Sequence, residues 1–392
     1  MRQRRIPAVF MRGGTSKAIV FHEKDLPDDR GVWPELFVAA IGANDPNGRQ
    51  LNGMGGGISS LSKVCVVGPP SRPEADIDYT FFQLAPKNAS VDVSGNCGNM
   101  SSAMGPFALD EGLVKGKGGQ AEVKIHNTNT GKIITARFQI DEENAAVDGD
   151  FILPGVAGSG SPVSLDFLAP GGAKTGKLLP TGNPSDILQV ESVGKIEASM
   201  VDAANPCVFV RSEDLGVVGT EMPEILEADA GFLERMEAVR RTASVAMGIA
   251  SDLSQAAKIP SIPKVCVVSE TQDQNLLTGE KMSGNQADII ARMISVGQPH
   301  RAIPLTGALC LAVATQLNGS IPHGLCRPGR TQVRIGQPSG LTVVEAKMSV
   351  VDGNLFADSA SVVRTQRRLF SGYVYVPAKL TPSLDQMIFA AE

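Results

Sequence analysis

The sequence predicts a mixed α/β (α+β) protein made of two pseudo-symmetric halves, each with strands wrapped around a central buried helix. Two observations predict this fold. The first is an internal repeat, in which ISSLSKVCVV (Ile58–Val67) and IPSIPKVCVV (Ile259–Val268) agree at seven of ten positions. The second is a pair of segments that are apolar on nearly all sides, Met100–Leu109 and Ala308–Leu317. Such a pattern is typical of a helix enclosed by other elements.

Two further matches extend the repeat along the chain. Ala18–Leu26 (AIVFHEKDL) matches Cys207–Leu215 (CVFVRSEDL) at an offset of 189, and the strongest match follows at an offset of 201. Cys97–Ala103 aligns more weakly with Pro304–Cys310 at an offset of 207. Because the matches keep their order and the offsets grow slowly, one gene duplication with small insertions explains all three.

Each half has the same predicted order of elements. A strand leads to an amphipathic helix, around Pro34–Ile41 in the first half and around Phe232–Met247 in the second. The β-branched strand VCVV follows in both halves, and the buried helix comes after further strands. The segment Pro154–Pro184 is rich in Gly, Pro, Ser and Thr. We therefore place the boundary near residue 185, which gives domains 1–185 and 186–392.

Composition and charge argue against several classes of protein. The 392 residues carry a formal net charge of -5 without a dense Lys/Arg block, so we expect no nucleic-acid partner. No apolar run reaches the roughly 18–20 residues that span a bilayer, and the basic start lacks a signal-peptide core. We therefore predict a cytoplasmic protein without a membrane partner. The six cysteines form no CxxC pair and the four histidines show no metal-ligand spacing, so we expect free thiols and no metal site.

The segment SGNCGNMSS (Ser94–Ser102) is the first candidate for chemistry. Glycines leave the backbone bare on both sides of Cys97, and the polar residues after it open the apolar helix as capping residues do. The macrodipole at a helix N-terminus favours a thiolate, and the N–H groups there can hold a substrate carboxylate. Asn96, Gly98 and Asn99 are therefore binding candidates. The alternative is a small buried cysteine that only caps a turn.

Lys63, which ends SSLSK, is the candidate partner of that thiol. Only this copy of the repeat follows the glycine-rich segment GMGGGISS (Gly53–Ser60), and a lysine in a dry cleft has a lowered pKa and can act as a base. Its counterpart Lys264 is expected to be structural, and a surface lysine at a strand end is the alternative for Lys63 itself. The glycine-rich segment adds the binding candidates Gly53, Met54, Gly55 and Ser59.

Two more segments supply polar groups. MRGGTSK (Met11–Lys17) surrounds a Gly-Gly pair with two cations and two hydroxyls, which suits an anion, although an ordinary charged hairpin has the same composition. Its candidates are Arg12, Thr15, Ser16 and Lys17. His300 precedes the second buried helix and either faces the cleft or remains a loop histidine. Thr306 and Gly307, at the start of that helix, complete the binding candidates.

The motifs RGGTSK, GGGISSLSKV, SGNCGNMSS, KTGKLLPTGNP and PHRAIPLTGALCLAVA together resemble the methylaconitate isomerase (PrpF) family. Relatives of that family include methylitaconate isomerase and 4-oxalomesaconate tautomerase. The resemblance runs from about Arg12 to Ala314 and continues more weakly to the C-terminus. It implies a diaminopimelate-epimerase-like fold, with the active site at the domain interface and the N-termini of both central helices directed at the ligand. It also implies that Lys63 and Cys97 carry the acid/base roles.

One position departs from the related two-thiol epimerases. Those enzymes place a cysteine at each helix start, whereas Pro304 aligns with Cys97 here and cannot accept a proton. One thiol plus one lysine suits the movement of a proton along an allylic unit. With the resemblance, this implies an isomerase of small unsaturated di- or tricarboxylates that needs no cofactor.

The resemblance implies 2-methylaconitate (trans/cis isomerisation) as the substrate, on the methylcitrate route of propionate breakdown. The alternatives are methylitaconate and 4-oxalomesaconate. A non-enzymatic alternative is an accessory protein that binds a partner dehydratase. Methylcitrate dehydratase is the functional partner that the resemblance implies, and a homodimer is the expected assembly.

Overall fold

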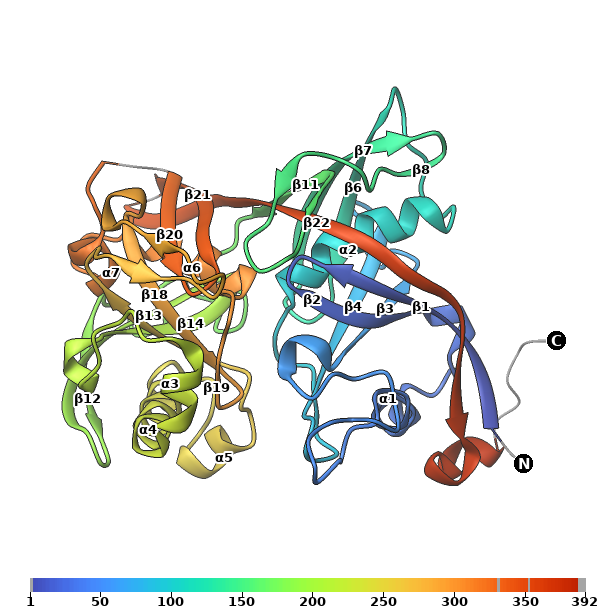
Figure 1. Cartoon of the computed structure of the whole chain (residues 1–392), viewed down its shortest axis with the longest axis horizontal. Helices are drawn as coiled ribbons and strands as arrows, with labels where there is room; N and C mark the ends of the chain where they lie inside the picture. The colour runs from blue at the N-terminus through green and yellow to red at the C-terminus, as the bar shows by residue number, and fades with distance from the viewer. Residues whose placement is uncertain (1–2, 330–331, 352, 387–392) are drawn as a thin grey trace.

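The computed structural model describes residues 3–329, 332–351 and 353–386, and it consists of two halves side by side (Figure 1). Strands surround helix α2 (Gly98–Asp110) in one half and helix α6 (Leu305–Ala314) in the other. Every residue of α6 and all but the last of α2 are buried. The predicted α+β fold, with a buried helix in each half, is confirmed. We refer to the half around α2 as the first half and to the half around α6 as the second half.

The elements follow the same order in the two halves. The first half contains β1 (Gln3–Gly13), β2 (Ser16–His22), α1 (Trp33–Ile41), β3 (Lys63–Gly68), β4 (Ile77–Leu84), β5 (Val91–Asp92), α2, β6 (Gln120–Asn127), β7 (Lys132–Asp141), β8 (Asn144–Ala145), the short pair β9 (Phe151–Ile152) and β10 (Ser159–Gly160), and β11 (Pro162–Leu168). The second half contains β12 (Asp186–Val190), β13 (Gly194–Ala203), β14 (Asn205–Arg211), α3 (Pro223–Ala228), α4 (Ala230–Ala246), α5 (Leu253–Ala257), β15 (Lys264–Ser269), the short pair β16 (Gln274–Asn275) and β17 (Lys281–Met282), β18 (Ile289–Ser295), β19 (Gln298–Pro299), α6, α7 (Ile321–Leu325), β20 (Gln332–Gln337) and β21 (Gly340–Val351). The last strand, β22 (Asn354–Pro377), extends across both halves.

The sequence repeat is also a repeat of strand register. β2 runs parallel to β3 with Ile19 opposite Val64, and β14 runs parallel to β15 with Val208 opposite Val265. Ile19 and Val208 are related by the offset of 189, and Val64 and Val265 by the offset of 201, so the two pairs occupy equivalent positions in the repeat. The sheet then continues in the same way in both halves. In the first half β4 pairs antiparallel with β3, and β6 pairs parallel with β4. In the second half β18 pairs antiparallel with β15, and β20 pairs parallel with β18.

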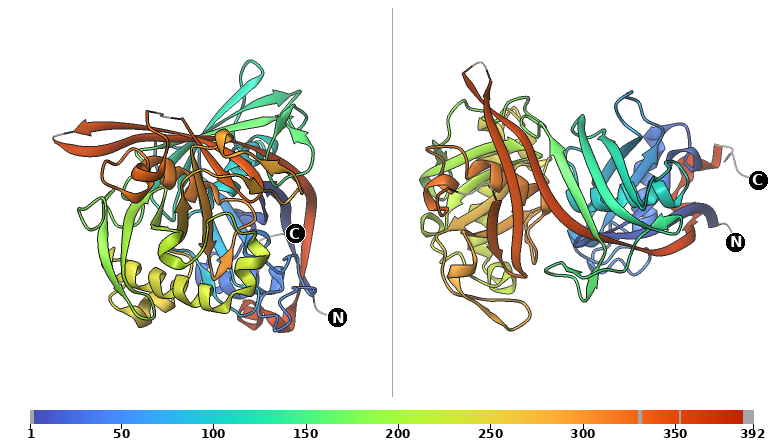
Figure 2. Two further views of the ribbon diagram at one scale, coloured as in Figure 1. Left: turned by 60° about the vertical axis from the view of Figure 1, so that its left-hand side comes forward. Right: turned by 90° about the horizontal axis from the view of Figure 1, so that it is seen from above.

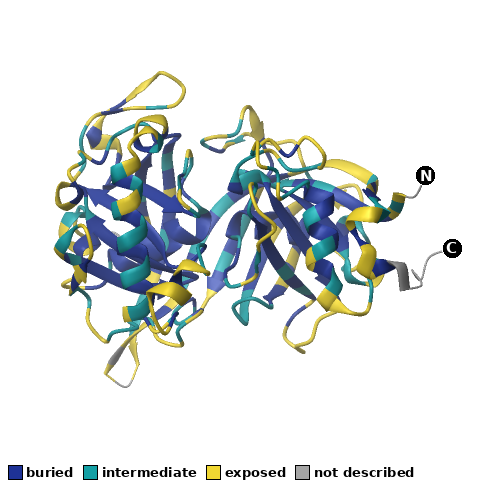
Figure 3. Ribbon diagram, turned by 90° about the horizontal axis from the view of Figure 1, so that it is seen from below, coloured by how far each residue is buried: buried dark blue, intermediate teal, exposed yellow. Residues whose placement is uncertain are grey.

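The VCVV strands are buried on both faces because a helix covers each face. In β3, Val64 and Val66 pack in the cluster of α1, while Cys65 and Val67 pack in the cluster of α2. In β15 the valines at the first and third positions pack with α4, and Cys266 packs with α6. A strand covered on both faces reads as a continuous apolar run, which explains VCVV. Figure 3 shows the buried residues in the interior of each half and the exposed residues on the outer loops and helix faces.

Strand β22 joins the strands of the two halves into one continuous sheet. Its N-terminal part pairs with β21, its middle pairs with β11 as well, and residues 366–377 pair with β1. Figure 2 shows this strand passing from one half to the other. The division near residue 185 stays a prediction, and β22 adds that the C-terminal residues return to the first half. No helix in the described ranges is long and apolar enough to cross a membrane.

Candidate active site

A cavity of about 410 Å³ lies between the halves, at the N-terminal ends of α2 and α6. The two helix starts touch at Gly98, where an added Cβ would lie 2.4 Å from Cδ2 of Leu305. Only glycine permits this approach, because a methyl group at that distance would overlap the leucine. The first N–H groups of both helices have no partner within their helix and are positioned to bind an anion.

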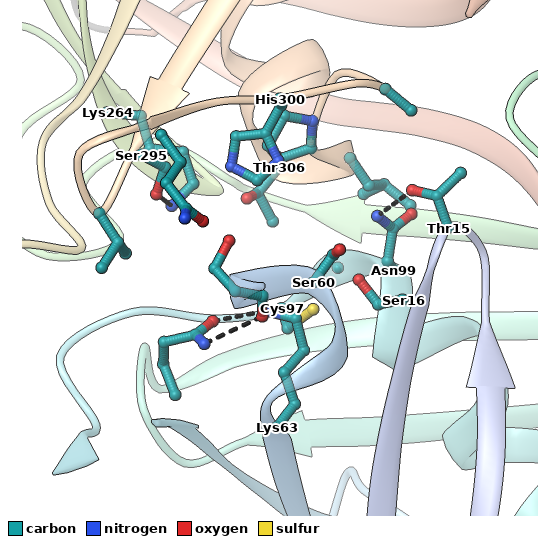
Figure 4. Close-up of a pocket in the computed structure, with 18 of the residues that line it drawn as sticks. Thr15, Ser16, Ser60, Lys63, Cys97, Asn99, Lys264, Ser295, His300 and Thr306 are labelled. Atoms are coloured by element: carbon teal, nitrogen blue, oxygen red, sulfur yellow. Dashed lines mark hydrogen bonds between the residues drawn. The ribbon is translucent and has the colours of Figure 1, made fainter. Parts of the chain in front are cut away.

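Cys97 occupies the N-cap position of α2, as the capping pattern in the sequence predicts. Its carbonyl accepts a hydrogen bond from the backbone N–H of Ser101 (3.0 Å) and another from the hydroxyl of Tyr79 (3.4 Å). The thiol is only partly buried and lines the cavity (Figure 4). Helix geometry and a buried tyrosine therefore hold the backbone that carries this sulfur.

Lys63 is the first residue of β3, and its side chain enters the same cavity although it is only 7% exposed. Its ammonium group donates a hydrogen bond to Oε1 of Gln83, the residue opposite it on β4. The amide of Gln83 donates in turn to the carbonyls of Ser59 and Ser62, which fixes its orientation. Burial lowers the pKa of Lys63, while the neighbouring thiols of Cys97 and Cys65 oppose that shift. A lysine in this environment is suited to proton transfer.

Asn99 joins the β1–β2 turn to the start of α2. Its side-chain amide donates to Oγ1 of Thr15 (3.0 Å), and its oxygen accepts from Nε of Arg364 (3.2 Å). Arg364 comes from β22 and is buried, so burial lowers its pKa to about 10. Ser16 follows Thr15 at the cavity wall. The C-terminal strand thus helps to orient the wall of the first half.

The second half contributes the opposite wall. In Figure 4, His300, Thr306, Lys264 and Ser295 face Cys97 and Lys63 across the cavity. Burial, together with the charges of Lys264, Lys63 and Arg301, lowers the pKa of His300 to about 3, so the imidazole is neutral. A neutral imidazole can donate or accept one hydrogen bond to a ligand.

Several buried polar atoms at this cavity have no partner within the described part of the chain. They are Oδ2 of Asp92, Oδ1 of Asn96, Oδ1 of Asn205 and Nε2 of His300. Unpaired buried polar atoms cost about 1–3 kcal/mol each, so their concentration at one cavity indicates a site that pairs them with a ligand.

The cavity brings together ten of the sequence-predicted site residues. These are Thr15, Ser16, Ser59, Lys63, Asn96, Cys97, Gly98, Asn99, His300 and Thr306. Arg12 and Lys17 do not line it. They form a cross-strand pair in the β1–β2 hairpin, next to the pair Gly13–Ser16. Because successive side chains of a strand point to opposite faces, Ser16 faces the cavity and the pair Arg12–Lys17 faces away from it. The guanidinium of Arg12 instead donates to the carbonyls of Gly14 and Thr365.

The remaining four candidates also lie away from the cavity. Gly53, Met54 and Gly55 wrap the C-terminal end of α1, where an added Cβ at Gly53 would lie 2.2 Å from the nitrogen of Gly42. The N–H groups of Met54 and Gly55 donate to carbonyls of α1. Gly307 packs against Met293, whose flexible side chain would have to shift for an added Cβ, because Cε lies 2.6 Å from that position.

Sequence reasoning missed other polar residues of the cavity. They include Ser60, Gln83, Asp92, Asn205, Ser261, Lys264, Ser295 and Arg301. The repeat could have identified Lys264, because it aligns with Lys63. Gln83 and Asp92 belong to no motif. In the described ranges, no group of three His, Cys, Asp or Glu side chains is arranged to hold a metal ion.

Comparison with known proteins agrees with this geometry. Residues 3–377 match the model of the family described as PrpF protein. The chain is 39% identical to the 3-methylitaconate isomerase of Eubacterium barkeri (95% of this chain, 98% of the relative). It is 36% identical to the 2-methyl-aconitate isomerase of Cupriavidus necator (96% and 98%).

A crystal structure of methylitaconate-delta-isomerase is similar, with a TM-score of 0.77 and 37% identity over 97% of this chain and 98% of that chain. A hydroxyproline epimerase from Agrobacterium vitis has a TM-score of 0.55 and 14% identity, covering 95% of this chain and 93% of that chain, and it shares the fold. The predicted epimerase-like fold is therefore confirmed, and the relatives are isomerases. This chain belongs to the PrpF family.

Proposed function

We propose that this isomerase moves a proton between two carbons of a small unsaturated di- or tricarboxylate, without a cofactor. One observation carries the proposal: Lys63 and Cys97 reach one cavity from different elements, beside the N-termini of two buried helices. The pair supplies a proton acceptor and a proton donor, and the helix N-termini supply sites for the carboxylates and the developing negative charge.

The reaction proceeds in two proton transfers. The amine of Lys63, whose pKa burial lowers, removes a proton from the carbon next to the double bond, and the electron pair of the broken C–H bond spreads into the conjugated carboxylate as a dienolate. The thiol of Cys97 then donates a proton to the other end of the allyl unit, or to the same carbon after bond rotation. Transfer of a proton from the lysine ammonium to the thiolate restores both groups.

The substrate that we propose first is 2-methylaconitate. Its three carboxylates suit a cavity whose walls carry Lys264, Arg301 and the N-termini of two buried helices. The relative named 2-methyl-aconitate isomerase is 36% identical over 96% of this chain. The second candidate is 3-methylitaconate, because the relative that acts on it is 39% identical. We also propose a cytoplasmic location and a step in the methylcitrate route, with methylcitrate dehydratase as the functional partner.

Proton exchange tests the proposal. The protein is incubated in deuterium oxide with 2-methylaconitate, 3-methylitaconate or 4-oxalomesaconate, and proton NMR follows the allylic positions. An isomerase washes deuterium into its substrate at the carbon that the base attacks. Absence of exchange with all three acids, together with binding to a dehydratase, would instead support the accessory role.

A further inference from the structure

Lys264 is the counterpart of Lys63 in the repeat, and the sequence alone predicts a structural role for it. It starts β15 as Lys63 starts β3, it is 8% exposed, and it lines the same cavity from the opposite wall (Figure 4). The ammonium of each lysine bonds the residue opposite it on the next strand. For Lys63 that residue is Gln83. For Lys264 it is Ser295, because β15 and β18 are antiparallel and Val265 pairs with Ile294.

The hydrogen-bond partners of Lys264 are neutral. Its ammonium donates to the carbonyl of Ser261 (3.2 Å) and to Oγ of Ser295 (3.5 Å), and within the described part of the chain it forms no ion pair. Arg301, the other cation on this wall, is paired with Glu227 and Glu224 at the surface. Lys264 is thus a buried lysine that has no carboxylate of the described residues within ion-pair distance.

Burial lowers the pKa of Lys264, and the positive charge of Lys63 acts in the same direction, while Asp92 and two thiols oppose it. The carboxylate of Asp92 is already bonded to Ser94 through Oδ1. Removing an ammonium from water is costly unless an anion compensates it. A ligand carboxylate in the cavity would supply that anion.

The two lysines cannot have the same role, because their helix starts differ. Beside Lys63 the N-cap of α2 is Cys97, which can exchange a proton. The N-cap of α6 is Pro304, which has no proton to give. At the cavity, the second half therefore has a cation and free helix N–H groups but no thiol at the start of its helix, and this is the chemistry of a carboxylate-binding site.

We infer that Lys264 binds a carboxylate of the substrate from the wall opposite Lys63 and Cys97. The site therefore selects acids with a second carboxylate outside the reacting allyl unit. This inference rests on the proposed function, since it names what distinguishes the substrates of that site. Lys264 is a binding and specificity residue, whereas Lys63 and Cys97 move the proton.

Calorimetric binding of itaconate and of its two monomethyl esters tests the inference. Itaconate carries two carboxylates around one allyl unit, and each ester removes the charge of one of them. We expect Lys264→Met to weaken itaconate binding about ten- to a hundred-fold, the range of a buried charged hydrogen bond. Binding of the ester that lacks the carboxylate facing Lys264 should change less than about three-fold. Lys258→Met, an exposed lysine of the same half, is the matched control and should bind all three ligands like wild type.

Two further variants and readouts separate the outcomes. Lys264→Arg keeps the charge and should retain the preference for the diacid, and melting temperatures show whether each variant is folded. An equal loss for the diacid and both esters, or no loss at all, would overturn the inference, as would a wild-type protein that binds none of the three ligands. Because binding needs no turnover, a selective loss in Lys264→Met without any deuterium exchange would refute only the proposed function.

Discussion

A comparison of Cys97 with Cys310 shows which cysteine of the two central helices can transfer a proton and which one only packs in the core. Cys97 lies at the start of α2 and lines the cavity, whereas Cys310 is enclosed in α6, where its thiol contacts the carbonyl of Val201 (3.3 Å). Burial raises the pKa of Cys310 far above its ordinary range. A thiol in that state does not exchange protons near neutral pH, so only Cys97 combines access with a place beside Lys63.

We expect Cys97→Ser to reduce turnover about 10²- to 10⁴-fold, because an alcohol does not replace a thiol as acid near neutral pH. The melting temperature should change little, since the hydrogen bonds of residue 97 involve its carbonyl. Steady-state rates on 2-methylaconitate and thermal unfolding measure the two effects. Cys310→Ser is the control and should lose stability while it keeps its rate per folded molecule. A Cys97→Ser variant with more than about a tenth of the wild-type rate would place the acid elsewhere.

His300 predicts a pH dependence of stability. Burial, with the charges of Lys264, Lys63 and Arg301, lowers its pKa from 6.5 to about 3 in the folded protein. Between these values the unfolded chain binds a proton that the folded protein does not, so the stability contributed by neutral His300 is complete above about pH 6.5 and falls as the pH decreases toward 3.

Urea unfolding of wild type and His300→Gln between pH 4 and 8 isolates this contribution. Other groups titrate in both proteins, so the difference in unfolding free energy between them reports residue 300. We expect wild type to lose more stability than the variant as the pH falls below 6.5. Parallel curves would show that His300 has the same pKa in the folded and unfolded states.

At the scale of elements, the repeat predicted much of the fold, because burial imposes the same pattern on equivalent elements. VCVV and the two all-apolar helices are sandwiched in the same way in both halves, so sequence and structure repeat together. Which side of a turn faces the cavity depends on the register of a hairpin. That register turns Ser16 toward the site and Lys17 away from it, and the composition of RGGTSK does not specify it.

The glycines show a second limit of sequence reasoning. Bare backbone suits a ligand, but it equally suits contact between two elements. Gly53 is needed where a loop meets α1, and Gly98 is needed where α2 meets α6. Gln83 and Asp92 could not be identified either, because their role comes from cross-strand neighbours that are distant in sequence.

The contact between α2 and α6 gives a prediction for Gly98→Ala. The new methyl group would lie 2.4 Å from Cδ2 of Leu305 and 2.9 Å from Cγ2 of Thr306, so these buried side chains must shift or the two helix starts must separate. Overpacking of this kind costs about 1–3 kcal/mol, and we expect that loss in the free energy of unfolding measured with urea. Turnover should also fall, because the helix starts form the floor of the cavity.

Two variants accompany this measurement. Gly324→Ala in α7 is the matched control, since an added Cβ there meets nothing within 4 Å, and it should be neutral or slightly stabilising. Adding Leu305→Ala to Gly98→Ala makes room for the methyl group and should recover part of the lost turnover. A Gly98→Ala protein as stable and active as wild type would show that the helix starts are not in tight contact.

At the scale of the whole molecule, the site depends on how the halves are joined. Contacts cross between them at the two helix starts and between the hydroxyls of Ser94 and Ser261 (3.0 Å). Strand β22 adds a continuous connection, because Ala360 is paired with Phe167 of β11 on one side and with Ala346 of β21 on the other. A cavity whose walls come from both halves keeps its geometry only while this connection holds.

We expect the two halves to unfold as one cooperative unit in spite of their separate cores. Trp33 is the single tryptophan of the chain, is buried against Phe37 and Phe82, and reports only on the first half. Far-UV circular dichroism also reports on the second half, which contains α4. Urea transitions followed by the two signals should therefore coincide, as two-state unfolding requires.

A variant in β22 completes this test. Ala360→Pro removes a backbone donor at the position where the strand passes between the strands of the two halves, and proline is poorly tolerated in the interior of a sheet. We expect the two transitions to separate in this variant, and the rate on 2-methylaconitate to fall even at urea concentrations where Trp33 still reports a folded first half. Separate transitions already in the wild-type protein would show that β22 does not couple the halves, and the positions of the two cavity walls would then depend on the helix-start contact and the Ser94–Ser261 hydrogen bond.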